Sequence, residues 1–269
     1  MQKTKSILLW LTPLLSLALA AVLDFSGFSS AISIVASVTF LCAVWWIFEP
    51  VPIPVTSLIP LAIFPLTGVL TSTQVAQSYG HHLILLLLGG FILSQSMVYS
   101  GAHKRIALMM CNLFGGNSPK RLVMGFMAAA ALLSMWISNT ATTLMLLPVA
   151  LATLQNNEDK QLTTVLLLGV AYAANVGGIG TPIGTPPNAL FLSTYQEATG
   201  NSIGFLGWMK WSLPLVFIFI PLMMLWLTRN IKSQQGTALP ETGKWTTIEK
   251  RVMWVFGITA LLWITRQEP

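Results

Sequence analysis

The chain has 269 residues, of which 54% are hydrophobic and only 8% are charged, and its mean hydropathy is +0.73. Soluble globular domains carry about 25% charged residues, so this composition excludes an ordinary soluble domain and predicts an integral membrane protein in a lipid bilayer. The net charge of +6 fits basic loops at a membrane surface, and we expect no nucleic-acid partner. Continuous apolar runs without alternation favour an all-α polytopic bundle over a β-barrel.

Four apolar runs occupy the first part of the chain, at 7–23, 31–48, 55–70 and 83–98. Lys3 and Lys5 before the first run also fit a signal peptide, although the run is longer than a usual signal core. We expect the second run to stop at the three prolines of 49–54, which remove amide donors. Cys42 and Cys111 lack metal-ligand spacing and are interpreted as small core residues.

A polar stretch from Ser134 to Thr143 interrupts the apolar region 122–154. Each apolar arm holds about 14 to 16 residues, or about 21 to 24 Å of helix, whereas a full crossing needs about 20 residues. We therefore predict a re-entrant hairpin at about 118–156, with Ser138, Asn139 and Thr140 at its tip. Two short spanning helices joined by a polar turn are the alternative.

A second interruption follows the apolar run 162–176. The segment 177–188 contains four glycines and three prolines, which cannot continue a regular helix. We predict a discontinuous helix at about 161–200. Further spans are expected from residue 208 or 211 to 227 and from 251 to 264.

The basic residues predict an orientation. With the N-terminus inside and the hairpin returning to its own side, only Lys210 and Arg266 of the fourteen Lys and Arg residues fall outside. This asymmetry is a strong positive-inside pattern and predicts a multi-pass inner-membrane protein with a cytoplasmic N-terminus.

Both interruptions carry groups that suit ligands. A helix that ends at membrane depth presents carbonyl oxygens to a small cation, and one that begins there presents amides and a positive dipole end to an anion. Ser138, Asn139 and Thr140 can cap the second hairpin arm, and Thr185 precedes Pro186 at a favoured helix start. The alternative is that these residues only cap helices and that the glycines only permit close packing.

The positions of the acidic residues narrow the chemistry. All eight fall at segment ends or in loops: Asp24, Glu49, Glu158, Asp159, Glu197, Glu241, Glu249 and Glu268. Proton-coupled carriers usually place a carboxylate or histidine inside the membrane. Neutral oxygens without a carboxylate suit Na⁺ balanced by an anionic substrate.

Two motifs together resemble the divalent anion/sodium symporter family. Members of this family carry citrate, sulfate or dicarboxylates such as succinate. The motifs are Ser-Asn-Thr with a downstream Leu-Pro (138–148) and Gly-Gly-Ile-Gly-Thr-x-x-Gly-Thr-Pro-Pro-Asn (177–188). The resemblance implies the first inverted repeat of an elevator-type transporter, a homodimer when full length, co-transported Na⁺, and no organic cofactor.

The resemblance also implies roles for individual residues. Na⁺ would be bound by Ser134, Ser138, Asn139 and Gly184. The substrate would be bound by Asn139, Thr140, Thr185 and Asn188.

The family has two such repeats, whereas one Ser-Asn-Thr hairpin is found in this sequence. We expect an N-terminal membrane helix and loop at 1–30, a first transporter repeat at 31–230, and a cytoplasmic linker with the start of a truncated second repeat at 231–269. An oxyanion or Na⁺/H⁺ carrier is the alternative function. An intramembrane enzyme is disfavoured, because neither Ser134 nor Ser138 has a nearby histidine in the sequence.

Overall fold

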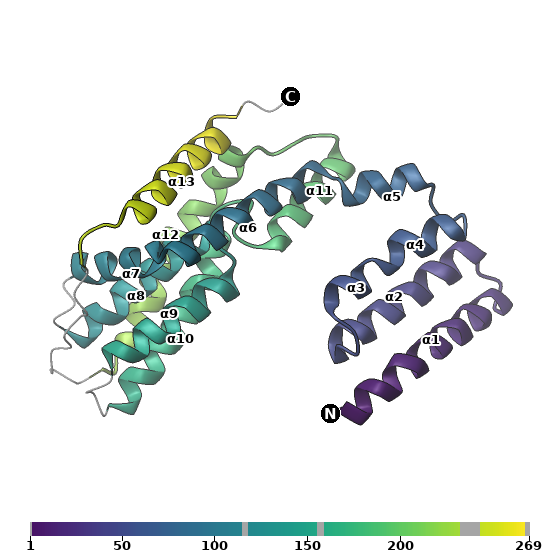
Figure 1. The fold of residues 1–269 in the computed structure, drawn as a ribbon, viewed down its shortest axis with the longest axis horizontal. Coiled ribbons are helices and arrows are strands. Elements are labelled where there is room, and N and C mark those ends of the chain that lie inside the picture. Colours follow the sequence, from purple (N-terminus) through teal and green to yellow (C-terminus); the bar gives the residue numbers. More distant parts are fainter. Residues whose placement is uncertain (1, 115–117, 155–158, 232–242, 267–269) are drawn as a thin grey trace. The chain divides into compact units, whose positions relative to one another are not determined.

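The computed structural model describes residues 2–114, 118–154, 159–231 and 243–266 (Figure 1). Helix makes up 82% of the structure, and the described residues contain no strand. The all-α prediction is therefore confirmed. The chain divides into two compact units, Met1–His81 and His82–Pro269. Compact units and transporter repeats are different divisions, so the predicted repeat boundaries stay predictions.

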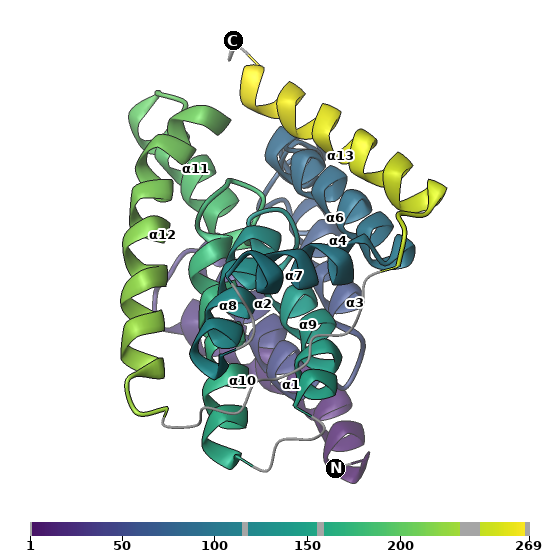
Figure 2. The ribbon, with the colours of Figure 1, turned by 90° about the vertical axis from the view of Figure 1, so that its left-hand side faces the viewer.

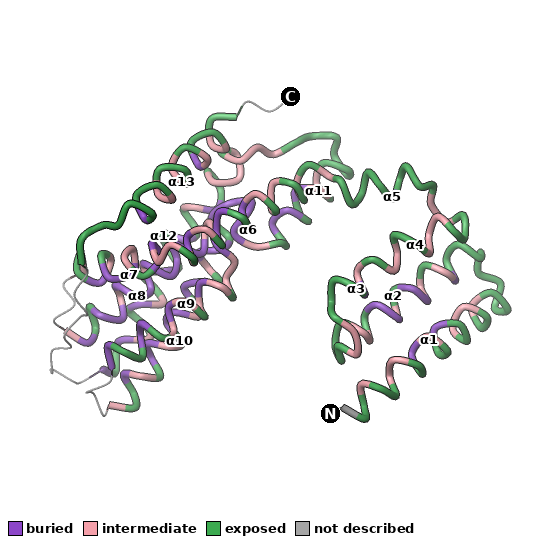
Figure 3. The backbone as a smooth tube through the Cα atoms, viewed as in Figure 1, coloured by how far each residue is buried: buried purple, intermediate pink, exposed green. Residues whose placement is uncertain are grey.

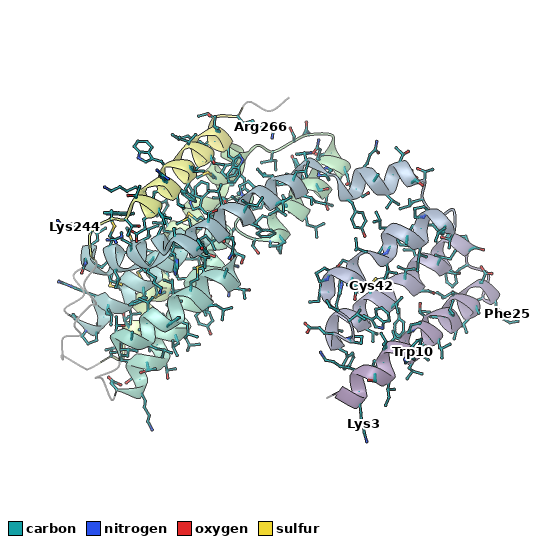
Figure 4. The ribbon with its side chains drawn as sticks, in the orientation of Figure 1. Lys3, Trp10, Phe25, Cys42, Lys244 and Arg266 are labelled. Atoms are coloured by element: carbon teal, nitrogen blue, oxygen red, sulfur yellow. The ribbon has the colours of Figure 1, made fainter. Side chains whose placement is uncertain are left out.

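The first unit contains five helices in its described residues: α1 (Gln2–Phe25), α2 (Ser30–Phe48), α3 (Ile53–Ser57), α4 (Ile59–Leu66) and α5 (Ser72–Tyr79). Helices α1 and α2 pack along each other. The Ser16 hydroxyl donates to the Ser37 carbonyl at 2.7 Å, and the Trp45 indole donates to the Leu8 carbonyl at 3.4 Å. Thr12 and Ser16 of α1 are buried, whereas most of its other described residues are exposed, and Phe25 at its end is 96% exposed (Figure 4).

The third apolar run was predicted as one continuous segment, and the structure differs from this prediction. It forms two short helices, α3 and α4, that meet at Leu58. Pro60 has no amide to donate to the Thr56 carbonyl one turn earlier, so a continuous helix loses that hydrogen bond. The Cys42 thiol lies 3.8 Å from this carbonyl and donates to it instead.

The second unit contains eight helices in its described residues: α6 (His82–Ser100), α7 (Ala102–Leu113), α8 (Pro119–Ser134), α9 (Asn139–Thr153), α10 (Lys160–Gly178), α11 (Pro186–Thr199), α12 (Phe205–Thr228) and α13 (Thr247–Thr265). Helix α8 is central, since 11 of its 16 residues are buried. It packs against α7, α9, α10 and α12. Figure 2 shows α12 beside the pair of α8 and α10.

Small residues bring α8 and α10 into close contact. A Cβ atom on Gly177 of α10 would lie 2.5 Å from the Cα atom of Ala131 on α8, so only glycine fits there. Buried residues concentrate on the facing sides of these helices, whereas α13 is largely exposed (Figure 3). Both cysteines are buried and free, as predicted. The hairpin and the break therefore adjoin the closely packed pair of α8 and α10.

Five stretches of the described residues are long and apolar enough to cross a membrane: Lys3–Phe25, Ser30–Phe48, Ser72–Ser100, Lys160–Gly178 and Phe205–Thr228. Helix α9 is apolar but shorter. Four charged residues that the sequence assigns to loops lie outside the described residues: Glu158, Lys232, Glu241 and Glu268. The same holds for the last residues of the predicted hairpin and for 267–269.

Candidate ion and substrate site

The turn between α8 and α9 forms the first part of the site. Helix α8 ends at Ser134, and Ser138 is the N-cap of α9, where its hydroxyl accepts a hydrogen bond from the Ala141 amide at 3.3 Å. This confirms the predicted cap. The two helices have 16 and 15 residues, or about 24 and 22 Å. Both are shorter than the roughly 30 Å hydrocarbon core of a bilayer.

Asn139 connects the turn to α10. Its side-chain oxygen accepts a hydrogen bond from the Ser134 hydroxyl at 2.7 Å, and its amide nitrogen donates to the Asn175 side-chain oxygen at 3.1 Å. Ser134 is fully buried, whereas Asn139 is half-buried and Asn175 is exposed. The three side chains form a short polar chain from the buried end of α8 to an accessible surface of α10.

The break forms the second part of the site. Helix α10 ends at Gly178, α11 begins at Pro186 with Thr185 as its N-cap, and residues 179–185 contain no helix. The predicted helix start at Pro186 is confirmed. The Gly180 amide donates to the Gly177 carbonyl at 2.8 Å, and the Gly184 amide donates to the Thr181 carbonyl at 3.3 Å. Two tight turns therefore separate the helix halves.

Donors from other elements satisfy the carbonyl groups of the break. The Trp208 indole donates to the Ile179 carbonyl at 2.7 Å, and the Ser212 hydroxyl donates to the Gly180 carbonyl at 3.0 Å. The Asn188 amide donates to the carbonyls of Gly178 and Thr181, each at 2.8 Å. Gly178, Gly180 and Thr181 are buried, and buried carbonyl groups need such partners. These side chains therefore stabilise the non-helical conformation of the break.

The hairpin turn and the break meet at Gly184. A Cβ atom on Gly184 would lie 2.9 Å from the Ser134 carbonyl oxygen and would overlap the Gly178 carbonyl oxygen. A Cβ atom on Gly178 would in turn overlap the Asn139 side-chain oxygen. The Thr181 hydroxyl also donates to the Met135 carbonyl, which ties the break to the turn. Backbone and side-chain oxygens from two segments that are distant in sequence therefore lie close together around Gly178 and Gly184.

The structure brings together three of the four residues predicted to bind Na⁺, namely Ser134, Asn139 and Gly184. The fourth, Ser138, lies in the same turn and uses its hydroxyl as a helix cap. Among the residues predicted to bind substrate, Thr140 is exposed and Thr185 is half-buried. No hydrogen bond between described residues joins either hydroxyl to the gathered oxygens.

Asn188 is placed differently from the other predicted substrate ligands. Its side chain is 6% exposed, and its amide nitrogen already donates two hydrogen bonds to the break. Its predicted contact with substrate stays a prediction. Its observed role is to hold the carbonyl groups of Gly178 and Thr181.

The sequence did not single out Asn175, Thr181, Trp208 or Ser212. Asn175 is an amide in the largely apolar second half of α10, which is a usable signal for a polar contact. Thr181 lies within the break motif, where a hydroxyl can reach a backbone carbonyl. Trp208 and Ser212 are four residues apart on α12, so they share one helix face. Nothing in the sequence shows that this face reaches the break.

The chemistry of the gathered groups is uniform. They are carbonyl, hydroxyl and amide oxygens, and the described residues contain no cluster of three or more His, Cys, Asp or Glu side chains. Neutral oxygens suit a hard monovalent cation. Helices α9 and α11 both begin beside this cluster, and their N-terminal amides and dipoles favour an anion. The geometry therefore fits the joint binding of a cation and an anion.

Several apolar helices and a site built from helix ends define a multi-pass helical membrane protein. A family model described as "Citrate transporter" (CitMHS) matches residues 43–267. The chain belongs to this citrate transporter family, which confirms the resemblance to divalent anion/sodium symporters.

The relatives that match this chain are also described as transporters. The chain is 36% identical over 255 residues to the "Sodium-dependent dicarboxylate transporter SdcS" of Staphylococcus aureus strains NCTC 8325, COL and N315. The match covers 87% of this chain and 49% of each relative. The chain thus spans about half the length of the curated relatives it matches. Family and relatives are described as transporters, not as enzymes.

Proposed function

We propose that this chain supplies one half of the binding site of a sodium-coupled symporter for divalent anions, such as a dicarboxylate, citrate or sulfate. The observation that carries the proposal is the meeting of Ser134, Asn139 and Gly184 beside the N-termini of two helices. The printed names of the family and of the staphylococcal relative support the class of cargo.

Na⁺ binds at the gathered oxygens. The Ser134 hydroxyl spends its hydrogen on Asn139, which leaves its oxygen lone pairs for a cation. The Asn139 oxygen accepts one hydrogen bond and keeps a second lone pair. The carbonyl oxygens of Ser134 and Gly178 both lie within 3 Å of the position that a Cβ atom on Gly184 would take, and we infer that the Gly184 carbonyl is a further ligand. Ser138 is the fourth proposed Na⁺ ligand, and it lies in the same turn as Ser134 and Asn139.

The anion binds next to the cation. The Asn139 amide nitrogen uses one hydrogen on Asn175 and offers the other to a carboxylate or sulfate oxygen. Thr140 at the start of α9 and Thr185 at the N-cap of α11 add hydroxyl donors at two positive helix ends. Because the protein groups are neutral, cation and anion balance each other's charge, which couples their binding.

The wider architecture belongs to the same proposal. Helices α8 and α9 form a re-entrant hairpin, which is supported by their lengths of 16 and 15 residues. The complete transporter is a homodimer that works by an elevator motion in the inner membrane, with a cytoplasmic N-terminus. The distribution of Lys and Arg residues supports this orientation.

A chimaera tests the proposal. The segment of the staphylococcal transporter that matches this chain is replaced by this chain, and uptake of labelled succinate into proteoliposomes is measured with Na⁺ or with choline. We expect uptake that requires Na⁺ and is inhibited by excess dicarboxylate. Uptake that follows a proton gradient without Na⁺ would instead support an ion carrier of another type.

Asn139→Ala is the decisive variant in this chimaera. The substitution removes a ligand of Na⁺ and a ligand of the anion. Na⁺-dependent uptake should therefore fall at least tenfold, which corresponds to about 1.5 kcal/mol, the free energy of one hydrogen bond to a charged group. Asn201→Ala is the matched control, because Asn201 is exposed in the loop before α12. Equal uptake by the two variants would refute the role of Asn139.

A further inference from the structure

An apolar pocket of about 200 Å³ lies between α7, α8 and α13. Its lining is wholly apolar and is rich in methionine, with Met109, Met110, Leu132, Trp136, Met253 and Phe256 among its residues. Apolar cavities of about 150 Å³ stay dry and accept small hydrocarbons. Methionine side chains adapt to flexible apolar ligands. The pocket is therefore suited to a hydrocarbon chain.

A second hollow adjoins this pocket and has a different character. It is lined by Trp245, Lys250, Met253 and Trp254, so Met253 belongs to both. Lys250 precedes Phe256 by six residues, or about 9 Å along α13. Trp254 is 73% exposed. Tryptophan and lysine side chains together are typical of the level at which lipid headgroups meet the apolar interior.

The charge of this hollow is positive and unbalanced. Lys250 is exposed, and it forms no ion pair with another described residue. The nearest acidic residue along the helix, Glu249, is already paired with Arg105 at 3.1 Å. Lys244 lies at the same end of α13 (Figure 4). Basic residues beside an apolar groove in a membrane protein favour an anionic lipid.

We propose that these two hollows form one site for an anionic phospholipid. An acyl chain enters the methionine-lined pocket, and the phosphate lies at Lys250. The lipid then touches Trp136 and Ile137, which also line the pocket and lie in the turn between Ser134 and Ser138. Bound lipid therefore supports the turn on which the candidate ion site is built. This proposal does not depend on the transported substrate.

Photolabelling tests the proposal. The purified chain in mixed micelles receives phosphatidylglycerol with a diazirine in one acyl chain, and labelled residues are mapped by mass spectrometry. We expect label on Met109, Met110 or Met253. Lys250→Glu should lower this labelling at least fivefold, since one basic residue near a membrane surface contributes about 1 kcal/mol. Arg251→Glu, which makes the same charge change outside the hollow, should lower it much less.

A second pair of variants tests the pocket. Met110→Trp fills it and should abolish labelling there, whereas Leu113→Trp on the same helix should not, because Leu113 is 74% exposed and outside the pocket. If Met110→Trp does not fold, the Lys250→Glu variant still tests the proposal, because Lys250 is exposed and its substitution leaves the packing of the pocket unchanged. Three outcomes would overturn the proposal: equal labelling by diazirine phosphatidylcholine, label only at other residues, or no label because another protein segment covers the pocket.

Discussion

Asn139 can occupy its position only because Gly178 has no side chain. The Asn139 oxygen fills the space that a Cβ atom on Gly178 would take. From there it accepts the Ser134 hydroxyl, while its nitrogen reaches Asn175 on α10. At the scale of single residues, the site therefore depends on the absence of a methyl group at Gly178, which leaves room for the Asn139 side-chain oxygen.

Gly178→Ala tests this fit. The added methyl group meets the Asn139 side chain and the packed end of α10, so we expect the free energy of unfolding to fall by about 1–3 kcal/mol. Na⁺-dependent uptake of the chimaera should be lost as well. Thermal unfolding in detergent and succinate uptake provide the two readouts.

Gly257→Ala in α13 is the control for this variant. A Cβ atom there has no heavy atom within 4 Å, and alanine favours a helix more than glycine does. Stability should therefore stay the same or rise slightly. If Gly178→Ala behaves like Gly257→Ala, Asn139 does not need the space that we assign to it.

The sequence predicts some residues of the site better than others. Ser138 and Pro186 were predictable because caps and helix starts depend on local backbone chemistry. The contact between Asn139 and Asn175 was not, because the residues are 36 positions apart and only tertiary packing brings them together. The binding roles of Thr140, Thr185 and Asn188 stay predictions.

At the scale of elements, α12 supports the break between α10 and α11. Trp208 and Ser212 each donate to a carbonyl group that α10 leaves without a helical partner. Thr181 returns a hydroxyl to the hairpin turn at Met135. The hairpin, the broken helix and α12 therefore act as one packed unit.

Trp208→Phe tests the support from α12. Phenylalanine keeps an aromatic ring but removes the donor to the Ile179 carbonyl. Because Ile179 is 40% exposed, water can replace the lost donor, and we expect the free energy of unfolding to fall by about 0.5–1.5 kcal/mol, the net value of one hydrogen bond. Thermal unfolding in detergent measures it. Trp211→Phe serves as the control, since Trp211 is 80% exposed on the same helix. Similar melting temperatures for both variants would argue against a supporting role for the indole.

Most helices could be predicted from runs of apolar residues, because membrane helices must satisfy their own backbone groups. Helices α5 and α7 are exceptions, because no predicted run covers them. The third run is another. Pro60 divides it into α3 and α4, and the prediction gave weight to its apolar length rather than to this missing amide. The short lengths of α8 and α9 were predicted, whereas their re-entrant course stays a proposal.

At the scale of the whole molecule, one ion pair joins parts of the second unit that are far apart in sequence. Arg105 on α7 pairs with Glu249 at the start of α13 and also donates to the carbonyls of Gly243 and Lys244. Its guanidinium lies 4.8 Å from the centre of the Trp245 ring. The segment that leads into α13 is thereby fixed against the helix that precedes the hairpin.

Glu249→Gln tests this connection. The Thr246 amide and the Arg105 guanidinium hold the pKa of the Glu249 carboxyl below its ordinary value. A lowered pKa means that the charge stabilises the fold above the ordinary pKa and that this contribution is lost as pH falls through the lowered value. We expect the variant to be about 1–3 kcal/mol less stable at neutral pH.

Melting curves at several pH values measure this effect. The difference between wild type and Glu249→Gln should shrink in acid, because the wild-type carboxyl is then protonated too. Glu197→Gln is the control, since Glu197 is exposed near the end of α11. A difference that stays constant with pH would mean that the charge of Glu249 contributes nothing.

Composition and two motifs were sufficient to predict the membrane class and the family. They could not predict that Arg105 and Glu249 meet, because charged residues at helix ends have many possible partners. They also could not reveal the pocket at Met110, whose walls come from helices that are distant in sequence.

The hydrogen bonds at the break have a consequence for exchange of the cation. Carbonyl groups at the end of α10 and in the break accept hydrogen bonds from Trp208, Ser212 and Asn188, and Thr181 ties the break to the hairpin turn. All four residues belong to the chain itself. Departure of a bound ion would therefore leave no unravelled helix behind. For the proposed Na⁺ site, we therefore expect entry and exit of the ion to exchange water for protein oxygens without refolding of the break.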